Sequence, residues 1–202
     1  MTSAPWRDEY TTVIKRVIIE EGATNVYNYA FESCSSLADV TLPSTLTKIG
    51  FAAFRYCDAL TKIVLPSNLT MLDTHAFYSA GLKEVNIPVA LTTLNSSAFY
   101  YCPIENLYIE DLEHLLSFSH DGELDYSNLY IKGDLVTDLV IPEGITSLYA
   151  CAFDNVTCLE SVTIPESVSE IGYGAFSNCE NLTSVYCYAT MIPQIEEYSS
   201  IF

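Results

Sequence analysis

The chain repeats one line of about 23 residues, and this repetition constrains the fold more than any other feature. "LPSTLTKIGFAAFRYC" at 42–57 returns as "LPSNLTMLDTHAFYSA" at 65–80, with Pro, Ala and Phe in the same places. The phenylalanines of the six Ala-Phe pairs are Phe31, Phe54, Phe77, Phe99, Phe153 and Phe176, at successive spacings of 23, 23, 22, 54 and 23 residues. A unit this short has no interior of its own, so each turn must bury its apolar side chains against the next turn.

Each part of the repeated line predicts a local structure. "LADVTLP" (37–43) alternates apolar and polar residues, as a half-buried strand does, and proline ends that strand because it has no amide donor. "TLTKIG" (45–50) predicts a second short extended run, and "AAFRYC" (52–57) predicts one helical or 3-10 turn that places Phe54 inside. We therefore expect an α/β repeat solenoid, with parallel strands on a concave face and short helical or 3-10 turns elsewhere.

The periodicity predicts a single domain over residues 1–202, with one interruption. The expected segments are regular repeats over 14–109, an irregular longer repeat over 110–135, regular repeats over 136–185 and a C-terminal cap over 186–202. Within the irregular repeat, "EDLEHLLSF" (110–118) predicts a short helix with Asp111 as N-cap, and "KGD" (132–134) predicts a turn between extended segments.

The shared line, Leu-x-x-Val-x-Ile-Pro-x-x-Leu-Thr-x-Ile-Gly-x-x-Ala-Phe-x-x-Cys, resembles the BspA-like class of leucine-rich repeats, found in surface proteins of bacteria and of some parasitic protists. The resemblance covers about residues 14–190, and "IPESVSEIGYGAFSNCENLTSV" (164–185) is the closest copy. Members are commonly described as adhesins or binding proteins. The resemblance thus implies a non-enzymatic protein-binding or adhesion module of a cell-surface or secreted protein; a structural spacer within a larger surface protein is the alternative.

Charge is distributed unevenly along the chain, whose net charge is −18. Residues 1–83 carry 8 acidic and 7 basic residues, whereas residues 84–202 carry 18 acidic residues and one basic residue, Lys132. A negative field repels phosphate backbones and anionic headgroups, which argues against nucleic acid as a partner. The same acidic residues also serve as a solvated surface that keeps an apolar chain soluble.

The location of the protein is constrained only in part by its sequence. No stretch approaches 18 apolar residues, so we expect no membrane insertion. The start, "MTSAPWRDEY", lacks the basic and apolar regions of a signal peptide. We expect an extracellular or cell-surface protein whose leader has been removed, with a cytoplasmic location left open, and we expect a monomer.

Two columns of strand residues are expected to face solvent on the concave side. One column holds Arg16, Asp39, Lys62, Glu84, Asn106, Asp138, Ser161 and Ser184; its neighbour holds Ile18, Thr41, Val64, Asn86, Tyr108, Val140, Thr163 and Tyr186. The candidate binding surface selected from them comprises Arg16, Asp39, Lys62, Glu84, Asn106, Tyr108, Asp138 and Tyr186. The first four charges alternate in sign, so a ladder of ion pairs between strands is the alternative to a binding role.

Tyrosine is abundant, with 15 residues. Tyr56, Tyr78, Tyr100 and Tyr101 fall in or just after the turns that carry the phenylalanines. They either pack between turns on the outer face or form an aromatic platform for protein or sugar. The expected partner is a protein, with a host extracellular protein or a glycan as the candidate ligands.

The residues that usually carry metal or redox chemistry show no site pattern. Cys34, Cys57, Cys102 and Cys179 share one repeat position that we expect to be buried as free thiols, although adjacent turns would allow a disulfide. No C-x-x-C, H-E-x-x-H, G-x-S-x-G or P-loop occurs, which predicts no enzyme, cofactor or zinc site. "SHDGELDYS" (119–127) hints at calcium but departs from the EF-hand pattern.

Overall fold

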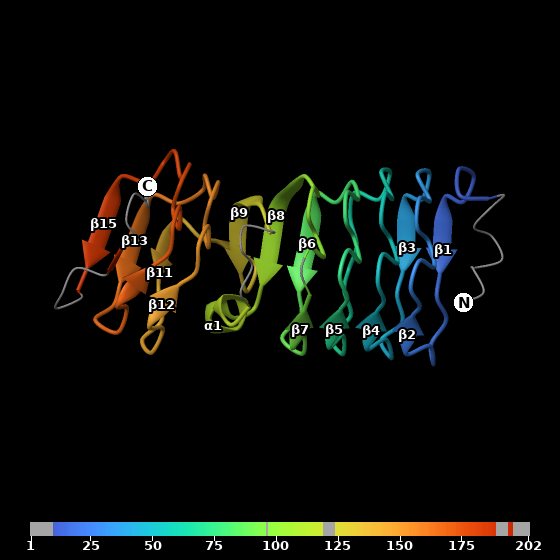
Figure 1. Ribbon diagram of the computed structural model, residues 1–202, viewed down its shortest axis with the longest axis horizontal. Helices are drawn as coiled ribbons and strands as arrows, with labels where there is room; N and C mark the ends of the chain where they lie inside the picture. Colours follow the sequence, from blue (N-terminus) through green and yellow to red (C-terminus); the bar gives the residue numbers. More distant parts are fainter. Residues whose placement is uncertain (1–9, 96, 119–123, 189–193, 196–202) are drawn as a thin grey trace. The chain divides into compact units, whose positions relative to one another are not determined.

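The computed structural model describes residues 10–95, 97–118, 124–188 and, for the backbone, 194–195. The chain divides into two compact units, residues 1–105 and 106–202, which are described separately (Figure 1). In each unit short strands recur at the period of the sequence repeat. The spacing of the Ala-Phe pairs thus predicted the repeated architecture correctly.

Unit 1 is built from two sets of short strands that stack side by side. One set contains β1 (Arg16–Ile18), β3 (Asp39–Thr41) and β6 (Glu84–Ile87); the other contains β2 (Asn25–Val26), β4 (Lys48–Ile49), β5 (Met71–Leu72) and β7 (Thr93–Leu94). β1 pairs with β3 in parallel, with Arg16 opposite Asp39, and Lys62 forms an isolated parallel bridge to Glu84. β2, β4, β5 and β7 form a parallel sheet in that order. The prediction of two parallel extended runs per repeat is confirmed.

The core of unit 1 is a column of phenylalanine rings, one from each turn. Phe54 is fully buried and stacks on Phe31 and Phe77 with ring centroids 5.3 Å apart in both cases. Phe77 stacks in turn on Phe99 at 5.4 Å. Because each ring is covered by the rings of the neighbouring turns, no turn has a complete core by itself.

The segments that carry these phenylalanines are turns and not helices, which corrects the α/β expectation. In each turn the residues two before and two after Phe have positive φ; around Phe54 they are Ala52 (φ 52°) and Tyr56 (φ 59°). A left-handed residue on either side of the ring stops a helix from propagating. Over the described residues the only α-helix is α1 (Leu112–Leu116).

The alternating backbone of the turns satisfies its polar groups in two ways. The amides of Ala52, Phe54 and Tyr56 donate to carbonyls of the next turn, at Thr74, Ala76 and Tyr78. The amides of the residues between them bond three residues back; Ala53, for example, donates to Gly50. Every turn is thereby hydrogen-bonded to its neighbour, which explains how a buried segment outside any sheet avoids unpaired backbone groups.

Unit 2 repeats this plan after the irregular segment. β11 (Asp138–Val140), β13 (Ser161–Ile164) and β15 (Ser184–Cys187) form one parallel sheet, and β12 (Ser147–Leu148), β14 (Glu170–Ile171) and β16 (Gln194–Ile195) form a second. Phe153 and Phe176 stack with centroids 5.3 Å apart. The segment expected to cap the chain therefore contributes strand β16, which pairs in parallel with β14; residues 189–193 and 196–202 lie outside the described residues.

The irregular repeat contains a helix and a hairpin, as its sequence predicts. The Asp111 carboxylate accepts a hydrogen bond of 2.8 Å from the amide of Glu113 and so caps α1. After α1, β9 (Tyr126–Ile131) and β10 (Asp134–Leu135) pair antiparallel about Lys132 and Gly133, which both have positive φ. A two-residue loop with two left-handed residues matches the twist of a hairpin. β9 also lies beside β8 (Ile104–Ile109), between β8 and β10.

Candidate binding surface on the strand face

The strand face is the set of side chains that point outward from β1, β3, the Lys62 bridge and β6 in unit 1, and from β8, β9, β11, β13 and β15 in unit 2. The eight predicted site residues all belong to it. Arg16, Asp39, Lys62 and Glu84 lie in unit 1, and Asn106, Tyr108, Asp138 and Tyr186 lie in unit 2. Each group is therefore a separate candidate surface.

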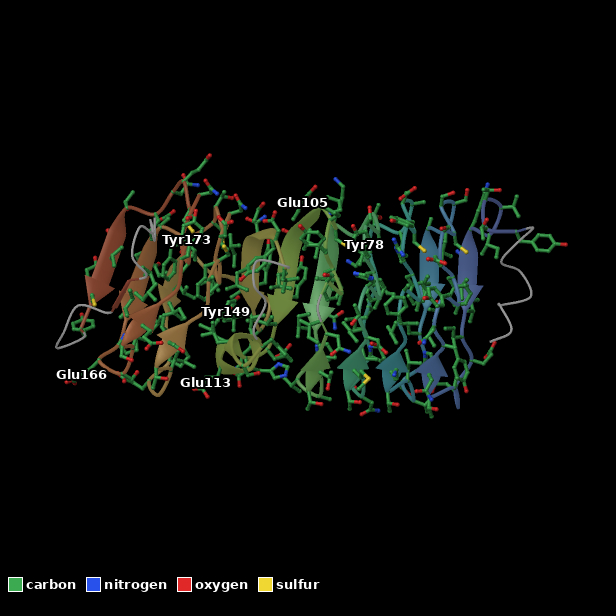
Figure 2. All side chains as sticks on the ribbon, in the orientation of Figure 1. Tyr78, Glu105, Glu113, Tyr149, Glu166 and Tyr173 are labelled. Carbon is green, nitrogen blue, oxygen red and sulfur yellow. The ribbon has the colours of Figure 1, made fainter. Side chains whose placement is uncertain are left out.

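The charged side chains of the first column in unit 1 form ion pairs with one another. Arg16 Nε lies 2.6 Å from Asp39 Oδ2, and Lys62 Nζ pairs with Glu84 Oε2. Lys83 adds a third pair, with Glu105 Oε1 at 2.7 Å from Lys83 Nζ, and Glu105 is labelled in Figure 2. These side chains are exposed, and exposed pairs contribute at most about 1 kcal/mol each. The ion-pair alternative considered for this column is thus observed for its first four members.

The neighbouring column of unit 1 holds exposed apolar side chains. Ile18 is 59% exposed and Val64 is 66% exposed. Asn86 interrupts this column, because its carboxamide hydrogen-bonds the amide and the carbonyl of Leu65 at 2.8 and 2.9 Å. The Asn86 side chain makes the hydrogen bonds to Leu65 that the backbone of a paired strand would otherwise make. This accounts for the single parallel bridge between Lys62 and Glu84 in place of a longer pair of strands.

In unit 2 the irregular repeat adds two residues to the columns that sequence reasoning missed. Asn106 accepts a hydrogen bond of 3.0 Å from Asn128, and the Tyr108 ring stacks on Tyr130 with centroids 4.7 Å apart. Both partners lie 22 residues downstream, on β9. That spacing is the signal that could have revealed them, although β9 has no Ala-Phe pair to mark it as a turn of the stack.

The later strands of unit 2 combine a fixed carboxylate with exposed apolar residues. Asp138 accepts hydrogen bonds from the hydroxyls of Ser161, at 2.5 Å, and Thr137, at 3.2 Å. Two members of the second column are exposed: Val140, on the same strand as Asp138, by 62%, and Tyr186, two strands away on β15, by 52%. The predicted residues of unit 2 therefore provide aromatic and aliphatic surface beside one oriented carboxylate.

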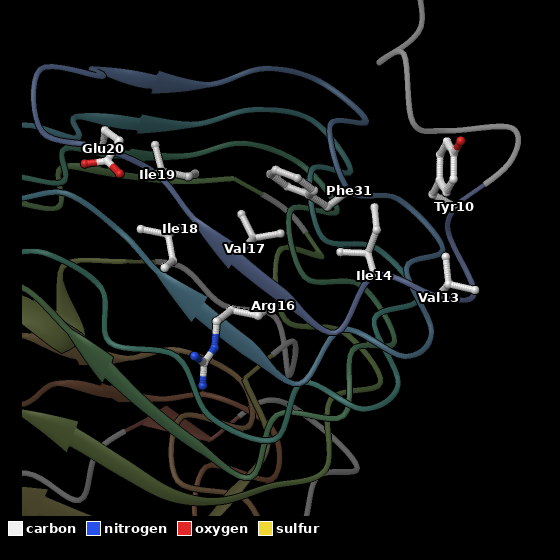
Figure 3. A pocket seen from close by; sticks show the side chains of 9 residues that line it. All are labelled: Tyr10, Val13, Ile14, Arg16, Val17, Ile18, Ile19, Glu20 and Phe31. Atoms are coloured by element: carbon white, nitrogen blue, oxygen red, sulfur yellow. The ribbon is translucent and has the colours of Figure 1, made fainter.

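A depression lies at the β1 end of unit 1 (Figure 3). It has a volume of about 700 Å³ and is lined by Tyr10, Val13, Ile14, Arg16, Val17, Ile18, Ile19, Glu20 and Phe31. Figure 3 shows Ile14, Val17 and Phe31 directed toward the same space. Among the described residues, the charged side chains of its lining are Arg16 and Glu20, and most of the remaining lining is aliphatic or aromatic.

Metal-binding side chains do not cluster in the part of the chain that the structure describes. There, no three His, Cys, Asp or Glu side chains come close enough to hold an ion. Residues 119–123, which carry most of the calcium hint, lie outside the described residues. Nor does any described helix combine the length and apolar character that crossing a membrane requires.

The repeated cysteines have a structural role in the turns. Cys34, Cys57, Cys102 and Cys179 are buried, as predicted, and all seven cysteines are free thiols. The Cys57 thiol donates to the carbonyl of Phe31, 3.2 Å away, in the preceding turn, and Cys102 and Cys179 make the equivalent bonds to Phe77 and Phe153. Burial raises the pKa of Cys179 to about 11 and that of Cys102 to about 12, so these thiols stay protonated donors.

Comparison with protein families gives one match that covers most of the chain. The model for the BspA type leucine rich repeat region (6 copies) matches residues 9–119 and 126–199. No curated protein is significantly similar to the chain.

Several solved structures of bacterial proteins are similar to the chain. A leucine rich cell surface protein from Faecalibacterium prausnitzii is 24% identical, with a TM-score of 0.50, over 87% of this chain and 55% of the other. A leucine-rich repeat protein from Eubacterium ventriosum is 20% identical, with a TM-score of 0.49, over 98% and 65%. The Leucine Rich Repeat protein of T. pallidum is 24% identical, with a TM-score of 0.40, over 90% and 73%. The chain thus spans between half and two thirds of the first two proteins.

Proposed function

Because the chain belongs to the BspA type leucine rich repeat family, we propose that it is a non-enzymatic binding module of a cell-surface or secreted protein and that its ligand is a protein. Solenoids of this kind bind partners over an extended face and not in a single pocket. The similarity to a leucine rich cell surface protein supports the proposed location. The apolar lining of the depression beside β1 supports binding over catalysis.

The observation that carries this proposal is the row of exposed uncharged side chains on the strand face of unit 2. Tyr108 stacks on Tyr130, and Val140 and Tyr186 are more than half exposed. Tyrosine is enriched among the residues that dominate protein interfaces, because its ring buries a large area while its hydroxyl keeps a polar partner. Asp138, already oriented by two hydroxyls, lies in the adjacent column.

The charge of unit 2 indicates the kind of protein that would bind there. Residues 106–202 contain 16 acidic residues and one basic residue, whereas residues 1–105 contain 10 acidic and 7 basic residues. Figure 2 labels two of the exposed acids of unit 2, Glu113 and Glu166. Such a field attracts a partner with a basic surface and accelerates association until salt screens it, over about 8–10 Å at physiological ionic strength.

A panel of purified host extracellular proteins, immobilised and probed with the whole chain, tests this proposal. For a protein that binds, Tyr186→Ala and Asp138→Lys should each weaken binding at least about tenfold, which corresponds to about 1.4 kcal/mol. The matched control is Lys62→Glu on the strand face of unit 1, which should leave the affinity within about twofold. Loss of binding with Lys62→Glu alone would refute the assignment to unit 2.

A structural spacer differs from a binding module in what this experiment would detect. A spacer would retain none of the panel proteins at any salt concentration, and Tyr186→Ala would have no binding phenotype. That outcome would overturn the proposed function.

A further inference from the structure

The six turns provide an internal comparison that singles out one group of tyrosines in unit 1. The residue two positions after each phenylalanine has a positive φ, between 54° and 63°. In the order of the chain these residues are Ser33, Tyr56, Ser79, Tyr101, Asn155 and Asn178. Four turns thus carry a small polar residue at this position, and two carry tyrosine.

The left-handed backbone does not account for tyrosine at these two positions. Asparagine adopts positive φ at small cost, and serine can bond its own backbone there, whereas a bulky side chain is strained. Left-handed conformations cost an ordinary residue about 1–2 kcal/mol. Strain of this kind persists where the surrounding structure imposes it, and it is enriched at functional sites. Tyr56 and Tyr101 are therefore candidates for a role beyond folding.

These two tyrosines belong to a continuous cluster, the tyrosine cluster, made of Tyr56, Tyr78, Tyr100 and Tyr101. Tyr78, which is labelled in Figure 2, is its centre, with ring centroids 5.8 Å from Tyr56, 5.9 Å from Tyr100 and 5.5 Å from Tyr101. Tyr100 and Tyr101 are 4.2 Å apart. Because Tyr56, Tyr78 and Tyr100 come from successive turns, the rings recur at the period of the stack.

The cluster presents an aromatic surface with balanced charge in an acidic chain. Tyr56 is 36% exposed, Tyr100 38% and Tyr101 66%. Arg55 lies over the Tyr56 and Tyr78 rings, 4.5 and 5.2 Å from their centroids, and its guanidinium is also 3.7 Å from Glu32. The cation is thus already matched by a carboxylate, so the cluster offers no unpaired positive charge to attract an anionic ligand.

The size of the exposed area argues for a ligand smaller than a protein. A buried aromatic side chain covers about 150–250 Å², so four partly exposed tyrosines offer a few hundred Å². A stable protein interface needs about 800 Å² from each partner. A chain-like ligand whose units repeat along its length matches both the small area and the recurrence of Tyr56, Tyr78 and Tyr100 on successive turns, where neighbouring rings are perpendicular or tilted to one another.

We propose that the tyrosine cluster binds a neutral oligosaccharide. The C–H groups on the face of a sugar ring carry partial positive charge and pack on the negative face of a tyrosine ring. The Tyr56 hydroxyl accepts a hydrogen bond of 2.7 Å from Arg55 and can still donate to a sugar hydroxyl, and a phenol group in general can both donate and accept. Successive sugar units would lie on successive turns, so affinity should rise with the length of the oligosaccharide.

Isothermal titration calorimetry of the whole chain with cellohexaose, maltohexaose and laminarihexaose, and with their disaccharides, tests the proposal. We expect at least one hexasaccharide to bind more tightly than its disaccharide. Tyr101→Asn and Tyr56→Ser, which restore the residue types of the other turns, should each raise its Kd at least about tenfold. The matched control, Tyr173→Ser, removes an exposed tyrosine from unit 2 and should change Kd by less than twofold.

Thermal unfolding separates a binding role from a structural one. Both substitutions relieve a strained backbone but also remove aromatic contacts of similar size, so the melting temperatures of Tyr101→Asn and Tyr56→Ser should stay within about 4 °C of that of the unmodified chain. Absence of binding by all three hexasaccharides, or equal Kd values for the variants, would overturn the proposal. A fall in melting temperature that accounts for the lost binding would also overturn it. None of these results bears on the strand face, because the protein-binding assay uses different residues and a different ligand.

Discussion

Replacing Phe54 by alanine measures how strongly one turn supports its neighbours. Phe54 is 0% exposed, and its ring stacks on Phe31 and Phe77 at interplanar angles of 17° and 4°. Truncating a buried phenylalanine costs about 3–5 kcal/mol, because the transfer free energy is lost and a cavity remains. Two aromatic pairs are broken as well, at about 0.5–1.5 kcal/mol each, which places the expected cost near the upper end of that range.

Urea and thermal unfolding, followed by circular dichroism, provide the assay. At about 2–4 °C per kcal/mol for a chain of this size, Phe54→Ala should lower the melting temperature by about 6–20 °C. Phe54→Leu, which keeps most of the volume, should cost about 1.5 kcal/mol or less. Tyr27→Ala, at a highly exposed position, should change stability by no more than about 0.5 kcal/mol. An unchanged melting temperature for Phe54→Ala would refute the stacking of turns through the phenylalanine column.

Two further predictions concern the thiols and the stability in acid. At pH 8 the exposed Cys187 should react with a thiol reagent in the folded chain, while Cys102 should not, because burial raises the pKa of Cys102 to about 12. In denaturant most of the seven cysteines should react. The recovery of three disulfides would contradict the free-thiol assignment. The pKa of Asp73 lies below its ordinary value: burial acts to raise it, but hydrogen bonds from the Thr74 amide and from Asn95, together with Lys48 at 3.2 Å, outweigh burial. Because the folded pKa is the lower one, the stabilisation is present above the unfolded pKa, near 4, and is lost as the pH falls through the folded pKa. Asp73→Asn should therefore cost about 1–2 kcal/mol at pH 7 and almost nothing at pH 2 in urea unfolding; an equal cost at both pH values would exclude the carboxylate as the cause.

The architecture could be predicted from the sequence because the residues that recur at the repeat period occupy the same structural position in each turn. Phe54 and Cys57 recur at a constant spacing and are buried, and Lys132 with Gly133 forms the expected hairpin turn. The backbone of the turns could not be predicted in this way. Ala52 and Tyr56 are residues that normally avoid positive φ, and only the hydrogen bonds to the next turn, absent from any local pattern, impose that conformation.

The candidate surface was predicted less completely than the fold. The ion pair between Arg16 and Asp39 follows from the repeat register, since the two residues occupy the same position in adjacent turns. Tyr130 was missed because β9 belongs to the hairpin and lacks the Ala-Phe pair that marks the other turns. Asn86 was expected to face solvent as a column member, but its carboxamide instead bonds the backbone of Leu65.

In the segments that carry the phenylalanines, the amides that bond between turns donate toward the later turn, and this gives those segments a common direction. In unit 2 the amides of Cys151, Phe153 and Asn155 donate to the carbonyls of Tyr173, Ala175 and Ser177, whereas just before this segment the amide of Gly172 donates back to Leu148. Aligned peptide dipoles add, as they do along a helix. Along these segments, partial positive charge therefore lies toward the later turns and partial negative charge toward the earlier ones. A further turn added after residues 174–178 would have to present carbonyls to that end, whereas one added before the first turn would have to present amides.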